Sequence, residues 1–78
     1  MQCFFVHFKC QLGRTYDVAE ELADAELASE IFSTSGDYDL IAKFYVEDEV
    51  DIGRFVNANV HKIDGIERTL TTLTFRAF

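Results

Sequence analysis

The sequence predicts a small α+β domain, and three observations lead to that prediction. The chain has 78 residues, so residues 1–78 are expected to fold as a single unit. Apolar residues recur at helical spacing in two windows, 16–25 and 52–60. Residues with high β propensity fill four other windows, at 2–10, 28–34, 39–47 and 66–78. Their order places one helix after the first strand and one before the last.

The first strand and the first helix each carry one apolar face. Phe4, Val6 and Phe8 alternate with more mixed residues, and alternate residues of a strand point to one face. Thr15 is the expected N-cap of the helix, because a hydroxyl can accept a hydrogen bond from the free N–H groups of the first turn. The apolar stripe of this helix consists of Val18, Ala19, Leu22 and Ala23.

A β-hairpin and a second helix follow. The hairpin is expected to turn at Gly36 and Asp37, because glycine tolerates a positive φ and aspartate bonds its own backbone. Asp48 and Asp51 mark the start of the helix as a carboxylate variant of the capping box. Its apolar stripe consists of Ile52, Phe55, Val56 and Val60. Asp64 and Gly65 give a turn before the last strand.

The order β-α-β-β-α-β predicts a ferredoxin-like fold, in which two helices cover one face of a four-stranded antiparallel sheet. The other face is left bare, with side chains such as Phe5, Ile41 and Tyr45. A large apolar surface invites a partner. Half of the chain (49%) is hydrophobic, so we expect two sheets to pack face to face as a dimeric α/β barrel.

Composition excludes several function classes. The net charge is −7, and seven basic residues are scattered among fourteen acidic ones. Binding to nucleic acid or to an anionic membrane depends on clustered Lys and Arg, so neither is expected. There is no convincing signal peptide and no apolar run of about 20 residues, which predicts a cytoplasmic protein.

Cys3 and Cys10 lie seven residues apart in one strand, roughly 23 Å, and therefore cannot form a disulfide within one chain.

No motif for catalysis, for a metal or for a cofactor is found, so an enzyme is not expected. His7 is interpreted as a hydrogen-bonded residue of the sheet or dimer face. His61 follows the second helix and is expected to contact its last carbonyls.

The hairpin tip is the most informative segment. Residues 35–39 combine a flexible glycine, two carboxylates, a hydroxyl and an aromatic ring. Asp37 or Asp39 would suit the ammonium group of an amino acid, and backbone N–H groups around Gly36 would suit its carboxylate. Taken alone, ordinary turn chemistry is the preferred explanation of these residues. Threonines on the last strand, at 69, 71, 72 and 74, add hydroxyls or simply reflect strand propensity.

Three separated segments carry a family pattern. They are FSTSGDYDLIAKF at 32–44, NVHKIDGIERTLT at 59–71, and Gly13-x-x-Tyr16-x-Val-Ala19. Together they resemble the C-terminal effector-binding domain, or RAM domain, of the Lrp/AsnC family. The resemblance covers nearly the whole chain in the family's order and spacing.

The resemblance implies dimers that pair through their sheets, octameric rings, and an amino-acid effector bound between dimers. Carried over by position, the implied ligand-binding residues are Gly36, Asp37, Tyr38, Asp39, Glu49, Thr69, Thr71 and Thr72. Family regulators have a helix-turn-helix domain before this one, whereas here a strand starts at Met1 or Gln2. The expectation is therefore a stand-alone effector domain with a natural start.

The predicted function is a stand-alone amino-acid-binding regulatory module that oligomerises and modulates full-length Lrp/AsnC-type regulators. Two alternatives stay open at this point. One is a small dimeric α/β-barrel enzyme, and the other is a purely structural assembly module.

Overall fold

The computed structural model describes all 78 residues and confirms the predicted order of elements. A π-helical segment, η1, continues the second helix. The elements are β1 (Gln2–Cys10), α1 (Thr15–Asp24), β2 (Glu30–Ser33), β3 (Leu40–Val46), α2 (Ile52–Phe55), η1 (Val56–Val60) and β4 (Ile66–Leu73).

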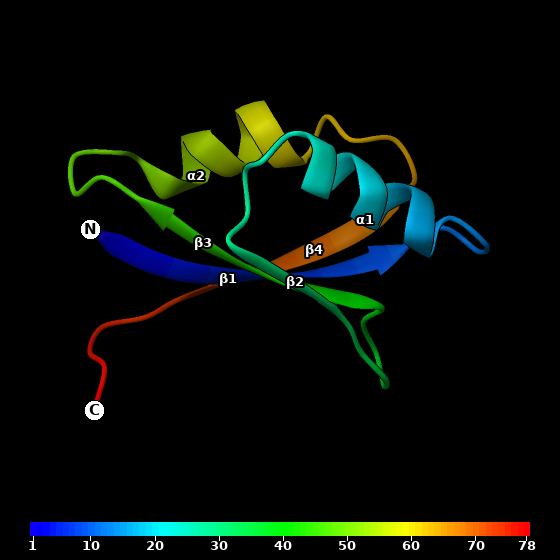
Figure 1. Ribbon diagram of the computed structural model, residues 1–78, viewed down its shortest axis with the longest axis horizontal. Coiled ribbons are helices and arrows are strands. Elements are labelled where there is room, and N and C mark those ends of the chain that lie inside the picture. The colour runs from blue at the N-terminus through cyan, green and yellow to red at the C-terminus, as the bar shows by residue number, and fades with distance from the viewer.

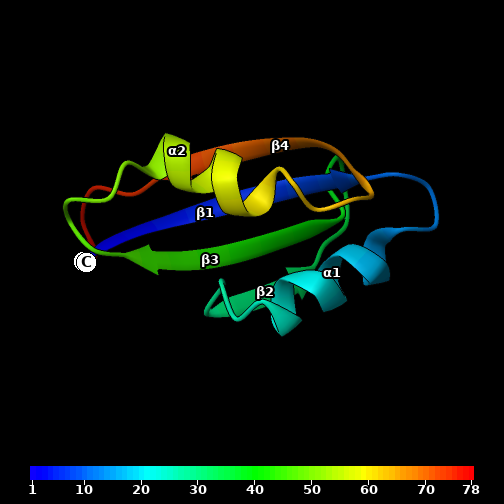
Figure 2. The same ribbon diagram turned by 90° about the horizontal axis from the view of Figure 1, so that it is seen from above.

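The four strands form one antiparallel sheet in the order β2-β3-β1-β4. Both helices lie on the same face of this sheet, and the opposite face has no cover (Figure 1). Seen from above, α1 lies along β2, whereas α2 lies beside β4 (Figure 2). This is the ferredoxin-like α+β architecture that the sequence predicts.

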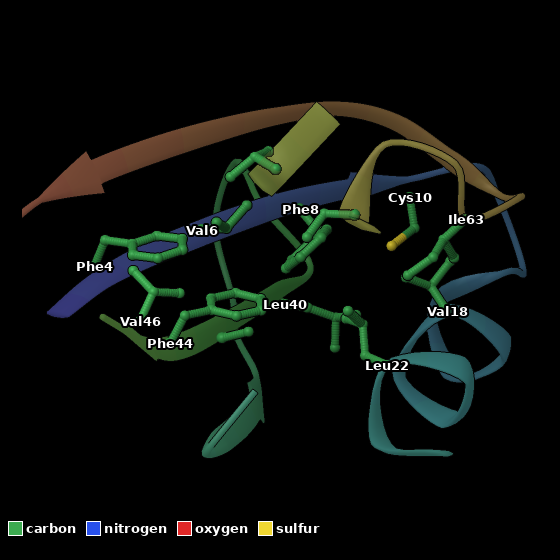
Figure 3. Packing of buried hydrophobic residues seen from close by; sticks show 13 residues of the cluster. Phe4, Val6, Phe8, Cys10, Val18, Leu22, Leu40, Phe44, Val46 and Ile63 are labelled. Atoms are coloured by element: carbon green, nitrogen blue, oxygen red, sulfur yellow. The ribbon is translucent and has the colours of Figure 1, made fainter. Parts of the chain in front are cut away.

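The hydrophobic core lies between the sheet and the helices. Even-numbered residues of β1 and β3 point into it, as alternation along a strand requires. Phe4 stacks on Phe44 with ring centroids 5.0 Å apart, and Phe55 meets both rings edge-on at 6.0 Å. From α1, Val18 and Leu22 complete the core (Figure 3). Ala23 was predicted to belong to the apolar stripe of this helix, but its side chain is exposed.

The uncovered face, here called the bare face, is built from the odd-numbered residues of β1 and β3. Phe5 and Ile41 are half-buried there, and Tyr45 is exposed, as predicted. Strand register adds Leu70, which lies opposite His7. Leu70 and Tyr45 keep 48% and 47% of their surface exposed, so the chain presents a substantial apolar area to solvent.

The predicted capping residues need correction at Thr15 and Asp48, although the second helix begins at residue 52 as predicted. Thr15 is the first residue of α1, and its predecessor Arg14 occupies the cap position without a side-chain hydrogen bond. Instead, Arg14 pairs with Asp17 at 3.0 Å. At α2 the cap is Asp51, whose carboxylate accepts the Arg54 N–H at 3.1 Å.

Asp48 does not cap a helix, because it pairs with the Met1 ammonium group at 2.9 Å. This hydrogen bond with Asp48 raises the pKa of the chain's α-amino group.

The last strand is shorter than predicted. It ends at Leu73, which lies opposite Phe4. Thr74 still donates to the Cys3 carbonyl through its N–H, at 3.4 Å, and its hydroxyl, at 2.6 Å. Beyond that point β1 begins, so residues 75–78 have almost no strand left to pair with, and Phe75 and Phe78 are fully exposed.

Both cysteines are free, as the sequence predicts. Cys10 is buried in the core, and Cys3 lies on the bare face. Burial raises the pKa of the Cys10 thiol, and nearby Asp39 raises it further. No helix in the chain is both long and apolar enough to cross a membrane.

Candidate functional site

The hairpin tip is a closed loop at one end of the sheet. Gly36 has a φ of +93°, which confirms the turn expected there and explains why a glycine occupies it. Thr34 closes the loop, because its N–H donates to the Asp39 carbonyl at 2.9 Å and its hydroxyl donates to the Tyr38 carbonyl at 2.9 Å. The tip points away from the helices, toward the bare face (Figure 1).

The two tip carboxylates differ in what they contact. Asp39 accepts the Cys10 N–H at 2.9 Å and lies 3.9 Å from the Lys9 ammonium, while its own N–H donates to the Phe8 carbonyl at 2.8 Å. These contacts fix the tip to the end of β1. Asp37 makes no side-chain hydrogen bond or ion pair within the chain and is exposed.

Tyr38 connects the tip to the last strand. Its ring lies 5.5 Å from the His7 ring, and the Arg68 guanidinium lies over it at 5.4 Å. Arg68 makes no ion pair within the chain, so its charge is balanced by no carboxylate. His7 is on the bare face as predicted, but its Nδ1 is buried without a hydrogen-bond partner, which contradicts the expectation of a satisfied side chain.

The three threonines of β4 do not share one face. Thr69 and Thr71 lie opposite Phe8 and Val6, so they point to the helix side of the sheet. Thr72 lies opposite Phe5 and points to the bare face. Within one chain, therefore, only Thr69 and Thr71 can act together, whereas Thr72 belongs with the bare face.

His61 joins the second helix to the last strand. Its ring Nδ1 lies 2.8 Å from the Asn57 Oδ1, and its Nε2 lies 2.8 Å from the Thr69 hydroxyl. The expected contact with the last helical carbonyls is wrong for the ring, because both nitrogens are occupied by these side chains.

Glu49 lies in the loop between β3 and α2, beyond the end of β3 that is opposite the tip. The seven residues of β3 separate these ends by about 23 Å. Within one chain Glu49 therefore does not meet Gly36, Asp37, Tyr38 or Asp39, and it would join them only from another copy.

The predicted ligand-binding residues did not include Asn57, His61 or Arg68, which lie beside them in the folded chain. The i, i+4 spacing of Asn57 and His61 is a signal that was available, because such residues are neighbours on a helix. No local sequence pattern predicts the contacts of His61 with Thr69 or of Arg68 with Tyr38. They depend on how β4 is placed beside the helix and the hairpin.

Asp39→Ala is expected to lower the free energy of unfolding by about 1–2 kcal/mol. The substitution leaves the half-buried Cys10 N–H without its acceptor. Urea denaturation followed by circular dichroism measures the loss. Asp37→Ala is the matched control and should change stability by less than about 0.5 kcal/mol. Equal effects of the two variants would show that Asp39 does not fix the tip.

The fold and this end of the sheet define a small ferredoxin-like α+β domain whose unpaired polar groups gather around the hairpin tip and β4. Residues 3–78 match the Lrp/AsnC ligand binding domain. The chain therefore belongs to the Lrp/AsnC ligand-binding-domain family, whose members include transcription regulators.

Known proteins support the same assignment. The HTH-type transcriptional regulator FL11 of Pyrococcus abyssi is 28% identical over 72 residues, which cover 92% of this chain and 47% of FL11. The chain thus spans about half the length of the curated relatives it matches. The crystal structure of TTHA0845 from Thermus thermophilus superposes with a TM-score of 0.89 at 31% identity and covers 100% of this chain and 98% of that one. AsnC of Escherichia coli, at 19% identity, shares the fold with a TM-score of 0.76 over 97% of this chain and 52% of AsnC.

Proposed function

We propose that this protein is an amino-acid-sensing regulatory module that assembles through its bare face and modulates full-length Lrp/AsnC-type regulators. The observation that carries the proposal is the match of residues 3–78 to a ligand binding domain. The effector would bind at the tip end of the sheet, between the hairpin tip of one chain and the last strand of a neighbouring copy, because Thr69 and Thr71 point to the helix side and the tip of the same chain points to the bare face.

The charges at this end suit a free amino acid, which carries one positive and one negative group. Arg68 has no carboxylate partner and lies beside Tyr38, so it is available to an α-carboxylate. Two carboxylates without partners, Asp37 and Glu67, lie on the tip and on β4 and are available to an ammonium group. Glu49 would enter such a site only from a neighbouring copy, which agrees with binding between dimers.

The bare face supports assembly. Leu70 and Tyr45 are about half exposed, and the half-buried Phe5 and Ile41 extend the apolar surface between them. A second sheet packed on this face would remove that surface from water at about 25 cal/mol per Å². The same face would let the protein mix with full-length family members, and pairs of dimers would then build larger rings, up to the octamer.

Light scattering on a sizing column, repeated with each of the twenty amino acids, tests the proposal. We expect a dimer or larger particle whose mass shifts with one or a few amino acids. Binding that favours one assembly shifts the equilibrium between assemblies only by its differential affinity, so the responding amino acid identifies the effector. An oligomer that ignores every amino acid would identify a structural assembly module instead, and a monomer would contradict assembly through the bare face.

A further inference from the structure

We infer that Phe75 anchors an interaction between two copies of this chain by inserting its ring into a cleft at the edge of the other copy's bare face. This inference rests on the proposed assembly through the bare face and adds to it a contact outside the packed sheets. The partner is a second copy, and the cleft that receives the ring is the one that this copy's own Phe75 borders.

Residues 74–78, here called the arm, leave the sheet on the side of the bare face. Figure 1 shows the arm running away from β4 on the side opposite to the helices. Two packed sheets lie about 10 Å apart, and the four residues 75–78 span about 13 Å when extended. The arm is therefore long enough to reach a second sheet that packs on the bare face.

Phe75 is presented to solvent by a fixed neighbour. Thr74 donates to the Cys3 carbonyl through its N–H and its hydroxyl, which ties the start of the arm to β1. The next side chain, Phe75, is 99% exposed. An apolar group whose backbone is already held loses less conformational freedom on binding. Phe78 is equally exposed but lies four residues beyond Thr74, so it lacks this support.

A cleft lies between the arm and the end of the sheet where β1 begins. Its volume is about 640 Å³, and bare-face residues that line it include Cys3, Phe5 and Tyr45. Pockets of this volume accommodate small ligands, so an aromatic side chain fits as well. The chain's own Phe75 borders the cleft but does not fill it, because its side chain is almost fully exposed.

The one cation of the sheet that lines this cleft favours an aromatic guest. The Lys43 ammonium lies 5.2 Å from the centre of the Tyr45 ring and 6.0 Å from that of Phe5. It also pairs with Glu30 at 3.7 Å, so its charge is partly balanced. An aromatic ring that enters beside Lys43 adds another π face for the ammonium group and requires no new countercharge.

Two properties of the arm point to a second copy as the partner. In a symmetric pair the contact forms twice, and two rings that each bury about 150–250 Å² supply about a fifth to a third of a standard interface of about 1,600 Å². The arm also carries one cation, Arg76, and no acidic side chain, whereas the chain has a net charge of −7. A second acidic copy therefore repels most of the molecule but attracts the arm.

Tryptophan fluorescence tests whether Phe75 is buried by a second copy. The chain contains no tryptophan, so Phe75→Trp introduces a single reporter whose emission moves to shorter wavelength when the ring leaves water. We expect this shift in concentrated, assembled protein. We expect its loss on dilution and in a double variant that also carries Leu70→Asp on the bare face. Phe78→Trp is the matched control, and its emission should remain that of a water-exposed ring throughout.

Two results of this experiment would overturn the inference. One is water-exposed emission from the Phe75→Trp reporter in assembled protein. The other is shifted emission in the dissociated double variant, because the arm would then close over the cleft of its own chain.

Sedimentation measures how much the anchor contributes to assembly. Phe75→Ala should raise the dimer dissociation constant by about 30-fold or more, because a symmetric pair loses two buried rings. Phe75→Leu keeps an apolar side chain and should lose less affinity. Phe78→Ala removes an equally exposed ring from the same arm and should change the constant by less than about threefold. Equal effects of Phe75→Ala and Phe78→Ala would contradict a specific anchor.

The anchor and the proposed assembly fail in different ways. If Leu70→Asp dissociates the pair but Phe75→Ala does not, the anchor is wrong, and assembly through the bare face still stands. If wild type is a monomer at every concentration, assembly through the bare face is wrong, and the anchor is wrong with it.

Discussion

Phe44→Ala is expected to lower the free energy of unfolding by about 3–5 kcal/mol. Phe44 is completely buried, stacks on Phe4 at 5.0 Å and meets Phe55 edge-on, so its removal leaves a cavity under both rings. A small domain is stable by only about 5 kcal/mol or somewhat more, and the variant should therefore be largely unfolded or close to it.

Urea denaturation followed by circular dichroism, at one protein concentration for all variants, measures this loss. The fixed concentration matters because the proposed assembly would add stability that depends on protein concentration. Phe78→Ala is the matched control, since the Phe78 side chain is fully exposed, and it should cost less than about 1 kcal/mol. A loss below about 1 kcal/mol in Phe44→Ala would contradict the central position of the aromatic stack.

Leu70→Asp is expected to weaken assembly by at least about 100-fold while leaving the fold intact. Leu70 is half exposed and lies on the bare face opposite His7, so a carboxylate there is tolerated in a free chain. In a symmetric pair of sheets the same substitution buries two carboxylates, and each costs several kcal/mol. Sedimentation measures the change in the dimer dissociation constant.

Two further measurements sharpen this test. Leu12→Asp is the control, because Leu12 is fully exposed in the loop before α1 and away from the bare face. Cys3 lies on the bare face, so it should react faster with iodoacetamide once Leu70→Asp separates the sheets. Cys10 is buried, and its raised thiol pKa lowers the reactive thiolate fraction, so it should stay slow in every variant. Unchanged assembly in Leu70→Asp would mean that copies meet through another surface.

The fold could be predicted because local signals agreed with the final structure. Alternation at Phe4, Val6 and Phe8 gave the buried face of β1, and the spacing of Val56 and Val60 gave the buried side of the second helix. Turn chemistry at Gly36 and Gly65 located two reversals of the chain, each with a positive φ. These signals are local, since backbone preference and side-chain direction depend on neighbours in sequence.

The ends of helices and strands were predicted less accurately, because tertiary contacts compete for the side chains and backbone groups that would end or extend an element. Asp48 suits a helix cap by composition, but the Met1 ammonium group lies nearby only after β1 and β3 have paired. Likewise, residues 74–78 have the composition of a strand, yet β1 offers them no further partner beyond Cys3 and Gln2. In both cases the sequence states a preference, and strand register decides whether a partner exists.

The sequence by itself determined the class of the fold, the apolar face of each element and the hairpin tip with its glycine. Only the tertiary structure decided which polar groups work together. In the folded chain, Asp39 holds the tip to the end of β1. Thr72 lies on the opposite face of the sheet from Thr69 and Thr71, and Glu49 lies at the far end of the sheet. The tertiary structure also brought Arg68 to Tyr38. The physical reason is that a site consists of contacts between segments distant in sequence, and these are fixed by strand register and helix placement and not by local preference.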